Sequence, residues 1–149
     1  CRPGGNARGP VRDLANFYTQ LLCDRGDFPP HLACNGERFL SEQTAQQFTS
    51  RQRVGLRDKT FGDTPIDWGF GFLMTPDASP TPRVPYGYGP HASPDTFGHS
   101  GNQLSCAFAD PVAGLVVVWC TNGQPGELVH QRRQRAINTA IYEDLGLAR

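Results

Sequence analysis

Two segments in the N-terminal part of the chain carry apolar residues at helical spacing. The first lies between Pro10 and Gly26 and predicts a helix with a broad apolar face, formed by Val11, Leu14, Ala15, Tyr18 and Leu22 with Phe17 and Leu21 alongside. Pro10 suits the first turn of this helix, and Gly26 is placed to end it. The second segment follows Ser41, whose side chain can cap the N-terminus of a helix. It predicts a short helix that directs Ala45 and Phe48 inward. Together the two predict a small helical layer.

A strand pattern begins with the letters "DWGFGFLM". In this stretch, 67–74, glycines alternate with Trp68, Phe70 and Phe72, which predicts a strand with aromatic side chains in the core and nearly bare backbone on its other side. A proline-rich connection over 75–95 follows. Loops of that length in compact domains are usually functional or disordered.

The clearest hairpin lies in the C-terminal half. Residues 103–109 and 115–121 predict two strands joined by the turn "DPVAG". The second strand is apolar on both faces from 115 to 119, so we expect it to be covered on both sides. Residues 127–145 predict a closing helix that ends at Gly146 and supplies part of this cover. The residues expected on its sheet-facing side are Val129, Ala136, Ile137, Ala140, Ile141 and Leu145.

The order of these elements predicts an α+β fold, an antiparallel sheet with flanking helices. Residues 1–66 would form a helical layer, and residues 67–149 would form the sheet strands, the hairpin and the closing helix. A chain of 149 residues corresponds to about one domain. Its formal net charge of +0 gives no electrostatic footprint for nucleic acid, and no apolar run is long enough for a membrane span.

The cysteines leave a disulfide question open. Five are present, so at least one thiol has no partner within the chain. Cys23 and Cys34 flank a proline-rich loop, where a bridge could form, but spacing alone does not decide it. With Cys1 and His31 they offer a zinc alternative, yet structural zinc sites normally show two closely spaced ligand pairs, so no metal is expected. The other two cysteines lie in predicted strands, where free cysteines are usually buried: Cys106 and Cys120.

The letters "GHSG" at 98–101 suggest a serine nucleophile with a histidine base. Two observations argue against Ser100 in that role. A nucleophile elbow needs Gly-x-Ser-x-Gly between a strand and a helix, but Asn102 follows and a strand comes next. Neighbouring residues in an extended segment point to opposite faces, so His99 is badly placed to take a proton from Ser100. In the structural alternative, His99 is a strand-end histidine bonded to a backbone carbonyl. The remaining histidines are expected on the surface: His31, His91 and His130.

The segment "DTFGHSGNQLSCAFADPVAGLVVVWCTN" resembles the final strand pair of the serine β-lactamase and penicillin-binding-protein superfamily, in particular its class C-like and esterase-like branch. In that family a Lys-Thr-Gly or His-x-Gly triplet opens the strand that lines the active site. A "FADPxxGL" hairpin and a strand ending in Thr-Asn follow. The segments "GNARGPVRDLANFYTQLL", "FLSEQTAQQFTS" and "DWGFGF" and the closing helix resemble other parts of the family in order. The resemblance implies the C-terminal portion of the β-lactamase/transpeptidase-like fold.

The resemblance also implies roles for four residues. His99 would orient the substrate and the proton network of the nucleophile, and Ser100 would offer its hydroxyl to the substrate. Gly101 would let the substrate backbone approach the strand closely. The backbone N–H of Asn102 would be one of two oxyanion-hole donors. No cofactor is implied.

Two of the family's three motifs are absent from the sequence. Its single lysine, Lys59, has no serine three residues before it, and no tyrosine is followed by asparagine two residues later. We therefore expect the chain alone to be inactive. The nucleophile and base would lie in a missing N-terminal part of the same catalytic domain, and the start at Cys1 favours a fragment.

The resemblance implies that the whole protein is a serine hydrolase that forms an acyl-enzyme. Its substrate would be a small molecule or a peptide: an ester, a D-Ala-D-Ala peptide or a β-lactam. The family favours a periplasmic or secreted location and leaves a cytoplasmic one open. The alternative is a non-catalytic binding module that keeps the fold without the nucleophile.

Overall fold

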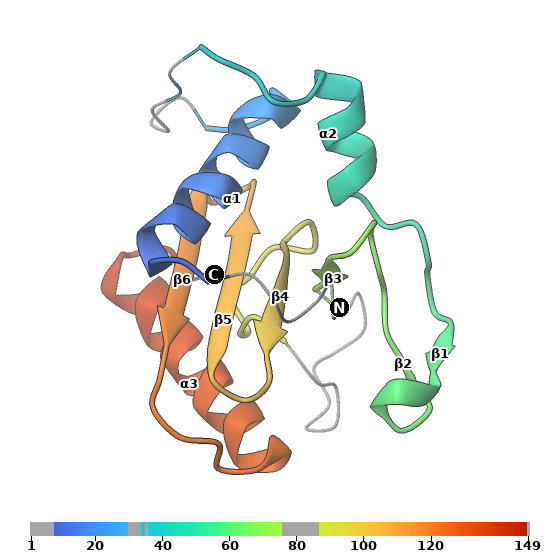
Figure 1. Ribbon diagram of the computed structural model, residues 1–149, viewed down its shortest axis with the longest axis vertical. Coiled ribbons are helices and arrows are strands. Elements are labelled where there is room, and N and C mark those ends of the chain that lie inside the picture. Colours follow the sequence, from blue (N-terminus) through green and yellow to red (C-terminus); the bar gives the residue numbers. More distant parts are fainter. Residues whose placement is uncertain (1–7, 30–33, 35, 76–86, 149) are drawn as a thin grey trace.

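The computed structural model describes residues 8–29, 34, 36–75 and 87–148. Its main feature is an antiparallel sheet with the strand order β3-β4-β5-β6. The elements in chain order are α1 (Val11–Arg25), α2 (Glu42–Thr49), β1 (Arg57–Asp58), the 3-10 turn η2 (Lys59–Phe61), β2 (Thr64–Pro65), β3 (Leu73–Met74), β4 (Phe97–Gly101), β5 (Ser105–Asp110), β6 (Leu115–Cys120) and α3 (Glu127–Asp144). α1 and α3 lie on opposite sides of this sheet (Figure 1). The α+β prediction is therefore confirmed.

The first helix begins and ends, and the second begins, where the sequence predicts. α1 follows Pro10 and ends at Gly26, whose φ of 76° is the left-handed conformation that glycine adopts without strain. At the start of α2, the Ser41 hydroxyl accepts a 3.2 Å hydrogen bond from the Thr44 N–H. The expected inward position of Phe48 is wrong, because its side chain is 41% exposed and rests against Phe70.

The sheet separates two apolar clusters because alternate strand residues point to opposite faces. On the α1 side, Tyr18 packs with Phe72 and Phe97. On the α3 side, Phe108 packs with Tyr88 and Tyr142. Strand β6 contributes to both clusters, so the expectation that this apolar strand is covered on both faces is confirmed.

The strand expected over 67–74 is much shorter. Only β3 pairs with β4, and the residues before it form a tight turn in which the Gly69 N–H donates to the Phe72 carbonyl over 2.8 Å. This turn places Phe70 at the surface, 53% exposed, so its expected core position is wrong. Phe72 is buried as expected.

Strand β4 is an element that the hydrophobic pattern does not predict. It carries the "FGHSG" stretch and pairs with β5 along its full length. The two strands approach so closely at Gly98 that an added Cβ would lie 2.2 Å from the Ala107 carbonyl oxygen. Glycine at this position is therefore required by packing.

The β5–β6 hairpin is confirmed, and Asp110 organises its turn. The buried carboxylate accepts hydrogen bonds from the N–H groups of Val112 and Ala113, from the N–H and hydroxyl of Ser93, and from the Tyr142 hydroxyl. Burial alone would raise the pKa of Asp110, but the bonds from Ser93 and Tyr142 hold that pKa below its usual value. The hairpin turn is thus tied to α3.

Helix α3 presents a polar face to the sheet, contrary to the sequence expectation. The residues buried along it recur every four positions: His130, Gln134, Asn138 and Tyr142. Asn138 accepts a 2.9 Å hydrogen bond from the Trp119 ring N–H, and Tyr142 donates to Asp110. Val129 and Leu145, expected to face the sheet, are 52% and 57% exposed. Gly146 ends the helix with a φ of 68°, as expected.

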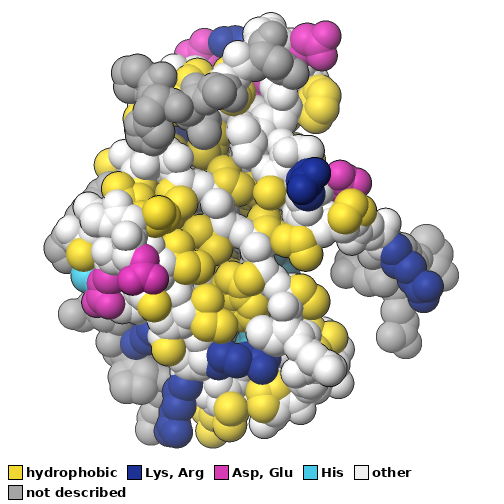
Figure 2. Space-filling view, turned by 90° about the vertical axis from the view of Figure 1, so that its left-hand side faces the viewer, with side chains coloured by type: hydrophobic (Ala, Val, Ile, Leu, Met, Phe, Trp, Pro, Cys, Tyr) yellow, Lys and Arg dark blue, Asp and Glu magenta, His cyan; other side chains and the backbone are white. Residues whose placement is uncertain are grey.

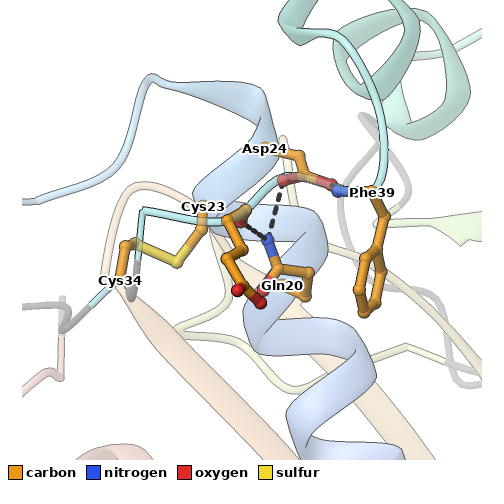
Figure 3. Close-up of a disulfide and its surroundings, with 6 residues drawn as sticks. Gln20, Cys23, Asp24, Cys34 and Phe39 are labelled. Atoms are coloured by element: carbon orange, nitrogen blue, oxygen red, sulfur yellow. Dashed lines mark hydrogen bonds between the residues drawn. A yellow bond between two sulfur atoms is a disulfide. The ribbon is translucent and has the colours of Figure 1, made fainter.

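A disulfide between Cys23 and Cys34 fastens the loop after α1, which answers the question that spacing left open. Next to it, Asp24 accepts hydrogen bonds from the N–H groups of Phe39 and Leu40, and the Gln20 amide donates to Asp24 (Figure 3). Both sulfurs are bonded to each other, so the zinc alternative that needs them as thiolates does not describe this structure. Its other two candidate ligands, Cys1 and His31, lie outside the described residues.

None of the described helices is long and apolar enough to cross a membrane. Part of the proline-rich connection, residues 76–86, lies outside the described residues.

Candidate active site

The candidate residues lie at the end of β4 and in the turn that joins it to β5. His99 points to the α1 side of the sheet and is exposed, whereas Ser100 points to the α3 side and is 6% exposed. This opposite orientation agrees with the extended geometry and separates the imidazole from the Ser100 hydroxyl. The two side chains therefore do not form a nucleophile–base pair.

The ring of His99 is oriented by two contacts. Its Nδ1 lies 2.7 Å from the Ser100 carbonyl oxygen, and because a carbonyl only accepts, this contact requires a proton on Nδ1. In the neutral ring the lone pair then resides on Nε2. The ring also packs against Trp68, with 5.8 Å between the ring centroids. The carbonyl contact of the structural alternative is thus present, and it fixes an imidazole that remains exposed.

The hydroxyl of Ser100 is directed away from this surface. It donates a 2.7 Å hydrogen bond to Oε1 of Gln134 on α3, in a buried position. A substrate on the His99 side could be reached only if this bond were broken and the side chain crossed the sheet. The Ser100 hydroxyl is therefore not placed to contact a substrate on the His99 side.

Gly101 and Asn102 are exposed at the end of the strand. Asn102 has a positive φ of 35° and begins the turn into β5. Its backbone N–H has no hydrogen-bond partner among the residues that the structure describes. A backbone N–H without a partner, on an exposed residue at the end of a strand, is a donor that a carbonyl oxygen of a ligand can occupy.

Trp68 is a contributor to this surface that sequence reasoning assigned to the core. The residue is half-buried, and its ring N–H donates a 3.2 Å hydrogen bond to the Asp58 carboxylate. The Arg53 guanidinium lies over the ring and also bonds to Asp58 over 2.7 Å. These contacts fix the indole that supports His99. Its place in a glycine-rich stretch, where a bend can expose a side chain, is the only signal of this role in the sequence.

Tyr18 lies beneath the backbone of His99. Burial raises the pKa of its hydroxyl, an effect reinforced by Cys106 and partly opposed by a hydrogen bond from the His99 backbone. The Tyr18 hydroxyl is therefore neutral and structural at physiological pH. The Tyr18 ring packs against Phe72 and Phe97 on this side of the sheet.

Comparison with known proteins supports the resemblance that the sequence suggests. The Beta-lactamase family model matches residues 2–141. A crystal structure of a beta-lactamase from Mycobacterium bovis is similar, with a TM-score of 0.63 and 28% sequence identity over 91% of this chain. The match covers 44% of that protein, so the chain spans less than half of its length. No curated protein matches the chain. The family match covers nearly all of the sequence, and the chain therefore belongs to the beta-lactamase family.

Proposed function

We propose that the chain supplies one wall of the active site of a beta-lactamase-related serine hydrolase that works through an acyl-enzyme. Two observations at the end of β4 carry this proposal: His99 is exposed with its ring oriented by the Ser100 carbonyl, and the Asn102 N–H, three residues further on, has no partner among the described residues. In this role the Asn102 N–H is one of two donors to the oxyanion that forms during acyl transfer. Loss of one such donor typically lowers kcat by about a hundredfold or more.

His99 holds the place of the first residue of the family's triplet. With its proton on Nδ1, the neutral ring has its lone pair on Nε2. In the proposed role this ring orients the substrate and the nucleophile's proton network. Gly101 carries no side chain between the strand and a substrate backbone. A serine nucleophile and its base are not assigned to any residue of this chain.

The rest of the catalytic domain is the proposed partner of this chain. On α1 three apolar side chains are exposed by 45%, 42% and 43%: Val11, Leu14 and Phe17. In Figure 2, which faces the side of the molecule where α1, β6 and α3 lie, hydrophobic side chains gather across the middle of the surface. β6 is the last strand on this side of the sheet. Its outer edge pairs with no other strand in the described part of the chain. Exposed apolar surface beside such an edge is typical of a face that pairs with further structure.

The test of this function uses the protein expressed from the complete reading frame. His99→Ala is expected to lower kcat/KM for a chromogenic ester or β-lactam by about a hundredfold, the range of a positioned donor or proton carrier. His91→Ala is the matched control, because His91 lies away from β4, on the other side of the sheet beside Tyr142. Equal kcat/KM values for His99→Ala and the unmodified protein would refute the assignment of His99.

The binding-module alternative is separated from the enzyme by a second observation in the same protein. An acyl-enzyme hydrolase requires a serine that becomes acylated, together with the Ser-x-x-Lys and Tyr-x-Asn motifs in the upstream sequence. If the complete reading frame contains the strands of the fold but neither motif, and binds substrate analogues without turnover, the binding module replaces the enzyme.

A further inference from the structure

The turn between β4 and β5 is held from outside by the segment that leads into α3. All three carbonyl groups between the strands accept hydrogen bonds from that segment or from α3 itself. The Asn102 carbonyl accepts from the Gln124 side-chain amide over 3.2 Å, and the Gln103 carbonyl accepts from Nη2 of Arg133 over 2.7 Å. The Leu104 carbonyl accepts from the N–H and the hydroxyl of Thr121 over 2.7 and 3.1 Å.

The backbone of this turn is strained at a residue that does not favour its conformation. Gln103 has a φ of 66° directly after Asn102 at 35°. Asparagine adopts positive φ readily, but glutamine has no such preference, and the left-handed conformation costs roughly 1–2 kcal/mol for a residue with a Cβ. Strain of this kind persists when the surroundings fix it, and it concentrates at functional sites.

Gln103 is bound by α3 through its side chain as well as its backbone. Its side-chain oxygen accepts a 2.9 Å hydrogen bond from the N–H of Gly126, the residue that precedes the first turn of α3. One residue thus receives two donors, the N–H of Gly126 just before α3 and the guanidinium of Arg133 within α3. The geometry couples the position of α3 to the conformation of the turn.

The contacts that Gly126 and Arg133 make with Gln103 are called the clamp. The peptide unit between Gly101 and Asn102 lies next to this clamp and carries the candidate oxyanion donor. The Gly101 carbonyl accepts a 2.8 Å hydrogen bond from the Leu104 N–H across the turn. The Asn102 N–H belongs to the same planar peptide group and points the opposite way from that carbonyl. The Gly101 carbonyl is therefore occupied, whereas the Asn102 N–H has no partner among the residues that the structure describes.

We propose that Arg133 and Gln103 are positioning residues that hold the 102–104 turn in its strained conformation and thereby aim the Asn102 N–H at the substrate. This inference rests on the proposed function for its catalytic consequence, but its structural part stands without it. Neither residue touches the substrate in this account. Both act through the backbone of Asn102.

The experiment compares Arg133→Met with Arg132→Met in the isotope-labelled 149-residue chain by NMR. Methionine keeps an apolar stem and removes the donors, and Arg132 is an exposed neighbour on the same helix. We expect Arg133→Met to abolish the short amide-to-Hα contact that positive φ creates at Gln103. It should also accelerate hydrogen exchange of the Leu104 amide about tenfold, the size expected when a hydrogen bond to a charged donor is lost. Arg132→Met should change neither.

A second substitution keeps the test decisive if Arg133→Met destabilises the whole fold. Gln103→Gly in the Arg133→Met background removes the cost of positive φ, so the turn should recover its conformation, with exchange at Leu104 within about threefold of the original. Arg133→Lys, which keeps one charged donor, should give an intermediate result. The proposal is overturned if Arg133→Met leaves the Gln103 conformation unchanged, if Arg132→Met has the same effect, or if Gln103→Gly fails to restore the turn.

The catalytic consequence is read in the protein from the complete reading frame. Arg133→Met should lower kcat and kcat/KM by the same factor with KM unchanged, because the donor acts on charge that appears only in the transition state. If the unmodified protein forms no acyl-enzyme, the proposed function fails, while the NMR comparison still decides whether the clamp exists. If the turn responds and turnover does not, the aim of the Asn102 N–H at the substrate is refuted.

Discussion

The Ser100 hydroxyl donates a buried 2.7 Å hydrogen bond to Oε1 of Gln134, which joins the candidate site strand to the helix behind the sheet. The Gln134 amide also lies 3.5 Å from the Gly87 carbonyl. This hydrogen bond gives Ser100 a structural role, although the letters "GHSG" suggest a nucleophile.

Gln134→Leu is expected to lower the free energy of unfolding by about 1–3 kcal/mol, because the Ser100 hydroxyl loses its partner in a buried position. Adding Ser100→Ala should restore most of the loss, since removing both polar partners is nearly neutral. Chemical denaturation of the single and double variants measures this. Gln131→Leu, on an exposed part of the same helix, is the control. Equal losses in the single and the double variant would contradict the pairing.

Gly98 should tolerate no side chain. A methyl group there would lie 2.2 Å from the Ala107 carbonyl oxygen and 2.6 Å from the Phe108 Cα, so β4 and β5 would have to separate. We expect Gly98→Ala to cost about 2–3 kcal/mol of unfolding free energy. Gly123→Ala is a poor match because of its positive φ, whereas Gly9→Ala adds a methyl group with no atom within 4 Å and serves as the control. A thermal melt in which the two variants unfold alike would show that the strands are not so closely spaced.

The hydrophobic pattern predicts α1, α2 and the β5–β6 hairpin because local signals coincide there. Pro10, Gly26 and Ser41 mark helix ends, and the DPVAG turn marks the hairpin. β4 escapes prediction because two glycines weaken its intrinsic strand preference. Its extended form comes from pairing with β5, a contact that no local window contains.

The buried face of α3 could not be predicted from apolar periodicity. The residues that face the sheet, His130, Gln134 and Asn138, are polar. Gln134 and Asn138 are tolerated there because Ser100 and Trp119 on the strands bond to them, whereas Nε2 of His130 is buried with no partner among the described residues. Val129 points outward instead, whereas Ile141 packs against the apolar cluster on the α3 side as expected. The roles of Trp68 and Arg133 could not be predicted from the sequence for a related reason, since both depend on contacts between segments far apart along the chain.

The two free cysteines should differ sharply in reactivity. Burial raises the pKa of the Cys106 thiol to about 12, whereas Cys120 is exposed at the end of β6. Because the thiolate is the reactive form, iodoacetamide at neutral pH should modify Cys120 and spare Cys106 in the folded chain. Peptide mapping by mass spectrometry measures both sites, and denaturant should expose Cys106. Rapid alkylation of Cys106 without denaturant would contradict the packing of the α3 side of the sheet.

Stability should fall under mildly acidic conditions because of His130. Burial lowers the pKa of this imidazole, Glu127 partly opposes the shift, and the adjacent Arg133 guanidinium adds to it. A histidine whose pKa is lower in the folded state gains its proton first in the unfolded state, so stability is full above the unfolded pKa of about 6.5 and declines as the pH falls below it.

Replacing His130 by a side chain that does not titrate isolates this effect. The difference in unfolding free energy between the unmodified chain and His130→Phe should stay constant above about pH 7 and shift in favour of the variant toward pH 5. Denaturant titrations across this range provide the measurement. A difference that does not change with pH would mean that His130 has its ordinary pKa.

The central claim is that His99, Gly101 and Asn102 form a wall of the active site while the attacking serine lies elsewhere. A fluorophosphonate probe tests it most directly, because the probe marks an activated serine and mass spectrometry locates the adduct. We expect no adduct on the 149-residue chain. In the protein from the complete reading frame, we expect one adduct on a serine of a Ser-x-x-Lys motif upstream of Cys1. Stoichiometric labelling of Ser100 would contradict the account.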